Sequence, residues 1–269
     1  MRHSWMMACA SSLLLASAGL VTAPAPAHEA PRAAAMAYVA LGDSYSAGVG
    51  AGDYLPGRKS CKRSSRAYPV LWAEAHGTTS FAFPACNGAQ AGDVRSGQLG
   101  ALGPATRLVT LTVGGSDAGF ARVMTSCDLG GTSLCLSTVA RARSAMDGPL
   151  VRDLDQLYSA IRERAPAAHV VVLGYPHLYH LRGGCEAGLQ DRARAAVNDG
   201  VDQLDAVIAR RAAAHGFTFA DVRAAFDGHE ICSRSPWMHG VDVPALTESY
   251  HPTAPGQARG YLPVLDRVS

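Results

Sequence analysis

The chain has 269 residues, of which 48% are hydrophobic and 17% are charged, and its formal net charge at pH 7 is +2. This composition is typical of a globular protein that buries a sizeable core, and it excludes an intrinsically disordered chain. So small a net charge also excludes a polybasic nucleic-acid-binding protein and an acidic tail, and we expect no nucleic-acid partner.

The first 27 residues have the pattern of a signal peptide. Arg2 precedes an apolar stretch from Ala8 to Val21, and small residues follow it up to Ala27. As a membrane anchor the stretch is short, since a bilayer core needs about 20 residues. Cys9 lies too early in it for a lipoprotein anchor. We therefore expect cleavage after Ala27, secretion into the extracellular medium and no stable membrane insertion.

Apolar runs and amphipathic segments alternate along the rest of the chain. Short apolar runs predict five strands, at residues 38–41, 80–83, 108–113, 170–173 and 217–219. Longer segments predict helices at residues 68–76, 150–164 and 190–215. This alternation predicts a three-layer α/β/α sandwich with a five-stranded parallel sheet. Since we find no internal repeat and no linker, one domain is expected to cover residues 33–269.

Ser44 follows the first predicted strand, just before a turn that contains Gly48. Open α/β sheets place their active sites at the carboxyl edge, which makes Ser44 a candidate nucleophile. On this segment alone, a helix-capping role for the serine is an equally good interpretation. The nucleophile elbow of α/β-hydrolases is missing, because Ser46 occupies its final glycine position. The nearby glycines lack the lysine of a phosphate-binding loop, so nucleotide binding is not expected.

His251 lies near the other end of the chain, in a turn-rich segment before the last expected helix. A serine is a weak nucleophile until a base takes its proton, and histidine is the usual base. A third group must orient the imidazole ring. The carboxylate of Glu248 or the backbone carbonyl of Ser249 could hold its Nδ1–H, and these residues alone leave the choice open.

The number of cysteines in the chain indicates whether the protein works in an oxidising or a reducing compartment. An even number in an exported chain indicates disulfides, although six cysteines allow 15 pairings. A zinc site is disfavoured because no close Cys-x-x-Cys pair occurs. Beyond the signal peptide the cysteines are Cys61, Cys86, Cys127, Cys135, Cys185 and Cys232.

Four short blocks in order give the chain a clear resemblance to the SGNH (GDSL) hydrolase family, over almost the whole chain after the signal peptide. They are Gly42–Tyr45, Ala85–Ala89, Val113–Asp117 and Ser249–Pro252. The resemblance implies a flavodoxin-like SGNH hydrolase fold and carboxylic ester hydrolysis without a cofactor or metal. It also implies that Ser44 is the nucleophile and His251 the base. In similar secreted actinobacterial members, the carbonyl two residues before the histidine replaces a triad acid, which favours Ser249.

The resemblance further implies an oxyanion hole formed by the N–H groups of Ser44 and Gly88 and by the side chain at position 116. The family's third block normally has asparagine there, whereas this chain has Ser116. A serine hydroxyl is shorter and free to rotate. Losing a preorganised donor typically costs about 10²–10³ in kcat, so the change affects the rate more than the reaction type. The alternative is that Ser116 only supports its loop.

Resemblance to the actinobacterial members also implies how the cysteines pair. The expected disulfides are sequential, Cys61–Cys86, Cys127–Cys135 and Cys185–Cys232. Two acidic residues of the blocks, Asp43 and Asp117, are expected to brace their loops rather than to act on the substrate.

The sequence defines the substrate only as an ester or lipid. The segments 53–66, 125–135 and 177–188 are expected to wall the site, with Leu55, Leu129, Leu134, Leu178 and Leu181 as candidate contacts for an acyl chain. A basic run could meet a phosphate head group, although solvated loop charge is the simpler interpretation; it comprises Arg58, Lys59, Lys62, Arg63 and Arg66.

We expect a monomeric lipase or esterase. The alternatives are a phospholipase A-type enzyme and a weakly active or non-catalytic protein that binds lipid or glycan.

Overall fold

The computed structural model describes Met1, residues 36–181, Cys185 and residues 188–269. It divides into two units, Met1–Ala34 and Ala35–Ser269, and the fold described below is that of the second unit. Apart from Met1, the expected signal peptide lies outside the described residues.

Five parallel strands form one sheet in the order β2-β1-β3-β4-β5. They are β1 (Ala37–Ala40), β2 (Ser80–Ala82), β3 (Thr106–Leu111), β4 (His169–Leu173) and β5 (Thr218–Ala220). The inner strands are nearly continuous apolar runs because helices cover both faces of the sheet. The strand order reverses between β1 and β3, which is where ligands bind in open α/β sheets. The predicted fold class is confirmed.

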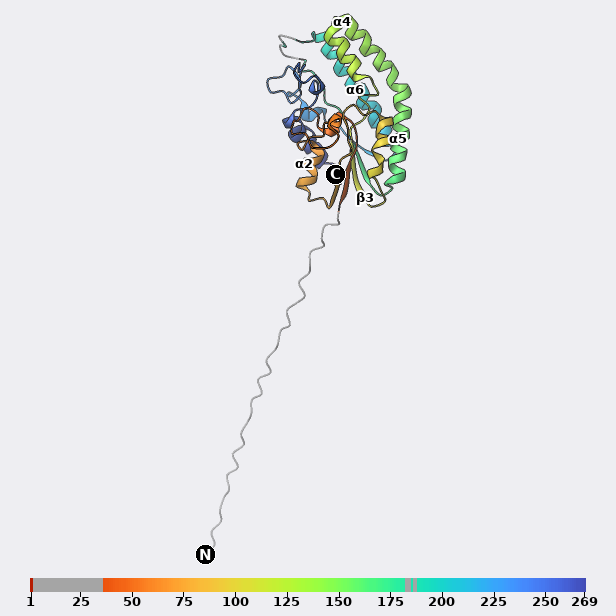
Figure 1. Ribbon diagram of the computed structural model, residues 1–269, viewed down its shortest axis with the longest axis vertical. Helices are drawn as coiled ribbons and strands as arrows, with labels where there is room; N and C mark the ends of the chain where they lie inside the picture. The colour runs from red at the N-terminus through yellow and green to blue at the C-terminus, as the bar shows by residue number, and fades with distance from the viewer. Residues whose placement is uncertain (2–35, 182–184, 186–187) are drawn as a thin grey trace. The chain divides into compact units, whose positions relative to one another are not determined.

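Helices cover the sheet from two sides, with α4, α5 and α6 on one side and α2 on the other (Figure 1). The helix α7 packs against α2, and α3 packs against α5. The expected helices end within two residues of their predicted bounds. The helices are α1 (Ser44–Ala47), α2 (Tyr68–Ala75), α3 (Ala91–Gly97), α4 (Phe120–Ala145), α5 (Val151–Arg164), α6 (Asp191–Ala214) and α7 (Leu262–Asp266).

The helix α4 differs from the sequence-based expectation, which treated residues 125–135 as a loop walling the site. The segment is rich in glycine, serine and threonine, which are weak helix formers. Gly131 does leave the helix, at a φ of 68°. The buried side chains of Met124 and Val139 pack on either side of this break, and the Cys127–Cys135 disulfide spans it. Tertiary packing and a covalent link therefore form a helix that local propensity does not predict.

The structure contains three disulfides, with the pairing that the resemblance implies. They are Cys61–Cys86, Cys127–Cys135 and Cys185–Cys232. The first joins the loop before α2 to the segment that follows β2. Within the described part of the chain, no helix is both long and apolar enough to span a membrane.

We predict that loss of a disulfide destabilises the fold in proportion to the loop that it closes. Cys61 and Cys86 are 25 residues apart, whereas Cys127 and Cys135 are 8 apart. Removing the first pair by double alanine substitution should lower the free energy of unfolding by about 3 kcal/mol, and removing the second by less. Chemical denaturation measures both values, and mass spectrometry of non-reduced peptides checks the pairing. A free thiol in the purified protein would contradict the pairing, and equal losses of stability would contradict the dependence on loop length.

Candidate active site

Ser44 is the first residue of α1 and lies directly beyond the carboxyl end of β1. The chain turns at Gly42, where φ is 119° and an added Cβ would collide with the backbone oxygen of Thr112. Only glycine fits such a position without strain. Asp43 then caps the helix by accepting a hydrogen bond of 3.0 Å from the N–H of Tyr45. The capping role that competed for Ser44 therefore belongs to Asp43.

His251 lies beside the serine, with Nε2 2.8 Å from Ser44 Oγ and Nδ1 2.9 Å from the backbone oxygen of Ser249. A carbonyl only accepts hydrogen bonds, so a neutral ring must carry its proton on Nδ1. The lone pair of Nε2 then faces the serine hydroxyl. Burial lowers the pKa of His251 to about 4, although the bond to the Ser249 carbonyl opposes this shift. At neutral pH the imidazole is thus an unprotonated base.

The carboxylate of Glu248 points to another partner. Its Oε1 lies 3.0 Å from Lys62 Nζ, which also donates to the hydroxyl of Thr247. Of the two groups considered for orienting the imidazole, the structure places the Ser249 carbonyl on Nδ1.

Tyr250 lies between Ser249 and His251 in the chain and adopts a left-handed conformation with φ of 65°. A non-glycine residue there costs on the order of 1–3 kcal/mol unless its surroundings hold it. Three hydrogen bonds do so: its N–H donates to the His239 carbonyl, its carbonyl accepts from Tyr45 Oη at 2.7 Å, and its own hydroxyl donates to Asp128 at 2.6 Å. Because Tyr45 follows the serine directly, one of these bonds ties the serine segment to the histidine segment.

The residues expected to form an oxyanion hole line two cavities: Ser44 and Ser116 line one, and Gly88 lines another. Gly88 has φ of 76°, and a side chain there would meet open space. Within the described residues, the N–H groups of Gly88 and Ser44 have no protein acceptor. Ser116 and Ser44 line the same small cavity. Among the described residues, the backbone N–H groups of Ser44 and Gly88 are thus free to donate to a ligand.

Asp43 and Asp117 brace the loops, as their place in the sequence blocks suggested. Asp43 accepts hydrogen bonds from Tyr45, Thr112 and Tyr175. Burial raises its pKa to about 6, and the bonds from Thr112 and Tyr175 oppose that rise. Both oxygens of Asp117 accept from the N–H of Ala91, which links the third sequence block to the start of α3.

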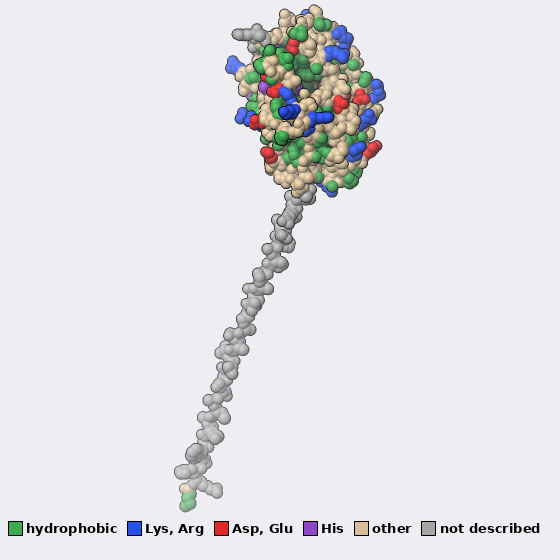
Figure 2. All heavy atoms as spheres, viewed as in Figure 1, with side chains coloured by type: hydrophobic (Ala, Val, Ile, Leu, Met, Phe, Trp, Pro, Cys, Tyr) green, Lys and Arg blue, Asp and Glu red, His purple; other side chains and the backbone are tan. Residues whose placement is uncertain are grey.

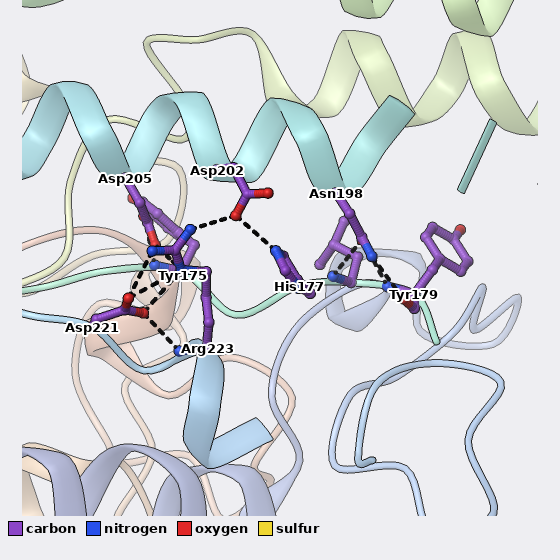
Figure 3. A network of polar contacts seen from close by, with 9 residues as sticks. Tyr175, His177, Tyr179, Asn198, Asp202, Asp205, Asp221 and Arg223 are labelled. Carbon is purple, nitrogen blue, oxygen red and sulfur yellow. Dashed lines mark hydrogen bonds and ion pairs between the residues drawn. The ribbon is translucent and has the colours of Figure 1, made fainter. Parts of the chain in front are cut away.

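The hydroxyl of Tyr175 joins two of the blocks, because it accepts from the N–H of Gly115 at 3.1 Å and donates to Asp43. The backbone N–H of Tyr175 in turn donates to Asp205 of α6 (Figure 3). Asp205 is buried, and burial raises its pKa to about 8. The missing side chain of Gly174 leaves room for this contact, since a Cβ there would lie 2.6 Å from the Asp205 carboxylate.

Further polar contacts hold the segment after β4 against α6. Arg223 bonds to Asp202 and Asp221, and Asp202 also bonds to His177 (Figure 3). Asn198 accepts from the N–H groups of Leu178 and Tyr179 and donates to the Tyr179 carbonyl. Sequence reasoning missed this network, since its members belong to no motif and lie far apart in the chain.

An apolar cavity of about 530 Å³ lies beside His251. Its lining includes Phe120, Met124, Leu129, Val241 and Leu246, together with Asn87 and Tyr250. This size suits a small ligand or an acyl chain.

Of the five leucines expected at the acyl site, Leu129 lines this cavity, and the buried Leu178 lines the smaller one that contains Ser44. The others, Leu55, Leu134 and Leu181, are exposed and line neither cavity.

Comparisons with known proteins agree with the site. Residues 40–259 match the model of the GDSL-like lipase/acylhydrolase family. The chain is 53% identical to a lipase of Streptomyces rimosus over 100% of both chains, and 54% identical to lipase 1 of Streptomyces coelicolor over 99% of each.

Two solved structures share both fold and sequence. The extracellular lipase of Streptomyces rimosus superposes with a TM-score of 0.85 at 54% identity, covering 87% of this chain and 100% of that one. The phospholipase A1 of Streptomyces albidoflavus gives a TM-score of 0.86 at 51% identity, with 88% and 100% covered. The chain therefore belongs to the GDSL-like lipase/acylhydrolase family and is a carboxylic ester hydrolase.

Proposed function

We propose that the protein is a secreted lipase-type hydrolase in which Ser44 is the nucleophile and His251 the general base. The observation that carries this proposal is the 2.8 Å contact between His251 Nε2 and Ser44 Oγ, because Nε2 is the unprotonated ring nitrogen. The backbone carbonyl of Ser249 orients the ring in place of a triad acid.

Acylation begins when His251 takes the hydroxyl proton and Ser44 Oγ attacks the ester carbonyl. The oxyanion accepts hydrogen bonds from the N–H groups of Ser44 and Gly88 and from the hydroxyl of Ser116. As the tetrahedral intermediate collapses, His251 donates its proton to the departing alcohol. Water then attacks the acyl-enzyme with His251 as base again, which releases the acid and restores the serine.

A lipid ester is the substrate that we propose, since the named relatives are lipases and an apolar cavity lies beside His251. Side chains of both charge signs are interspersed on the face seen in Figure 2, which gives no support to a nucleic-acid partner. We also propose that the protein is secreted as a monomer, with residues 1–27 as its signal peptide. The extracellular lipase of Streptomyces rimosus supports the secretion.

Single substitutions test these roles. Ser44→Ala and His251→Ala should each abolish hydrolysis of p-nitrophenyl esters, because nucleophile and base act as a unit. The matched control is Glu248→Gln, which should keep most of the activity because the carboxylate faces Lys62. A loss of about a thousandfold or more in this variant would assign the orienting role to Glu248. Full activity of the Ser44 variant would remove that serine from the mechanism, whereas no turnover by the wild type would favour a non-catalytic binding protein.

Position 116 tests the oxyanion hole. Ser116→Asn should supply a longer and more rigid donor, which we expect to raise kcat by about tenfold with little change in KM, since the bond forms mainly in the transition state. Ser116→Ala should lower kcat if the hydroxyl donates. Steady-state kinetics on one p-nitrophenyl ester compares the variants. An unchanged kcat in both would remove the side chain from the mechanism.

The buried imidazole makes a prediction about pH. Because burial lowers the pKa of His251 to about 4, the base stays unprotonated until the pH falls well below the ordinary histidine value of about 6.5. The acid limb of kcat/KM should therefore lie below pH 6.5, as measured on a neutral ester with circular dichroism as the control for folding. An acid limb at or above 6.5 would show an unperturbed imidazole.

A further inference from the structure

Ser44 lines a small cavity of about 40 Å³, which we call the Ser44 cavity. Its lining also includes Ser116, Phe120, Leu178 and Leu204. A buried water needs roughly 10–15 Å³ on this scale, so the cavity holds only a few atoms of an acyl chain. Because the carbonyl carbon of an acyl-enzyme is bonded to Ser44 Oγ, a longer chain must continue into neighbouring space.

Two apolar cavities adjoin the Ser44 cavity. The outer cavity is the one of about 530 Å³ beside His251. The inner cavity, of about 50 Å³, lies between the neighbouring helices α4 and α6 (Figure 1). Gly115, Val201 and Leu204 line both the inner cavity and the Ser44 cavity. Among the described residues, Phe120 alone lines all three cavities, so it lies where they meet.

The inner cavity suits an alkyl group. Its lining has apolar side chains from both helices, with Val123, Met124 and Val139 from α4 and Val197, Val201 and Leu204 from α6. Arg143 is the charged residue in the lining, and its Nε donates to the Gln203 side chain at 2.8 Å. Such a lining favours hydrocarbon over a polar alcohol group.

Phe120 is held firmly at the junction of the cavities. It is the first residue of α4, and its N–H donates to the Gly115 carbonyl at 3.1 Å. Its ring meets the ring of Tyr250 edge to face, with the centroids 6.2 Å apart. Gly115 precedes Ser116 and Tyr250 precedes His251, so both contacts are with residues next to the site. The ring is therefore a fixed wall rather than a mobile lid.

We propose that Phe120 makes the Ser44 site selective for linear acyl chains. Its ring separates the inner cavity from the Ser44 cavity, which leaves the outer cavity for the carbon atoms that follow the carbonyl. A chain that branches beside the carbonyl needs a second apolar space, and the ring excludes the second branch from the inner cavity. Phe120 is thus a specificity-determining residue that takes no part in bond making. This inference rests on the proposed function of Ser44.

Two isomeric esters test this selectivity. The acyl groups of p-nitrophenyl octanoate and p-nitrophenyl 2-propylpentanoate contain the same atoms, and only the second is branched. The preference for linear chains is the ratio of kcat/KM for the octanoate to that for the 2-propylpentanoate. Because both esters react at the same serine, a general loss of activity cancels in this ratio.

Phe120→Ala should lower the preference for linear chains by about tenfold or more, the effect of burying two further methylene groups. The matched control is Phe81→Ala, which should keep the wild-type preference. Phe81 is also half-buried, but it lies on β2 and lines none of the three cavities. Circular dichroism monitors folding. Phe120→Leu is a milder change that should shift the preference in the same direction by less, and it gives a second test if the alanine variant does not fold.

A further substitution shows whether the inner cavity is the space that Phe120 closes. Of the three cavities, Ala142 of α4 lines the inner one alone, and Ala142→Leu should fill part of it. Combined with Phe120→Ala, this change should restore most of the wild-type preference. Alone it should leave the preference unchanged, because the phenylalanine ring already excludes the substrate from that cavity.

Three outcomes would overturn the proposal. They are an unchanged preference in the folded Phe120 variants, an equal fall in Phe81→Ala, and a preference that Ala142→Leu does not restore in the double variant. Failure of the proposed function itself would appear differently, as hydrolysis of either ester that survives Ser44→Ala.

Discussion

The hydrogen bond from the Tyr45 hydroxyl to the Tyr250 carbonyl is the contact on which the rest of the site depends. The serine and histidine are 207 positions apart in sequence, and their segments share no strand or helix. Each of the two tyrosines is the immediate neighbour of Ser44 or His251. Their bond therefore helps to set the separation between the serine hydroxyl and the imidazole. The left-handed backbone of Tyr250 turns the next side chain towards Ser44, and Asp128 of α4 holds the tyrosine in place.

Rigid support on the other side of the serine comes from buried polar groups. Tyr175 connects Asp43 to Gly115, and Asp205 holds the backbone of Tyr175. Both carboxyl groups are buried. Asp43 accepts from several donors, and Asp205 lies near Arg223. The segments that flank the serine and position 116 therefore have little freedom. Such preorganisation is what electrostatic stabilisation of an oxyanion requires, because donors that are already aligned need no reorganisation during the reaction.

Much of this structure could be predicted from the sequence because it depends on residues that are close together in the chain. Apolar runs predict the strands of a buried parallel sheet, and short sequence blocks predict Ser44 and His251 as candidate site residues. The helix α4 could not be predicted, since packing and a disulfide overcome its glycines. The local sequence alone leaves open whether Glu248 or Ser249 faces the imidazole, and only the family resemblance favours Ser249. The ion pair that engages Glu248 involves Lys62, which is remote in sequence. The contacts of Tyr175 and Tyr250 join distant segments, so no periodicity or motif indicates them.

Covalent capture tests the central claim most directly. A p-nitrophenyl alkylphosphonate reacts with an activated serine and leaves a stable adduct that resembles the tetrahedral intermediate. The account predicts one adduct per chain, located by peptide mass spectrometry on Ser44, with labelling greatly slowed in His251→Ala and absent in Ser44→Ala. An adduct on another residue, or labelling at the wild-type rate in His251→Ala, would contradict it.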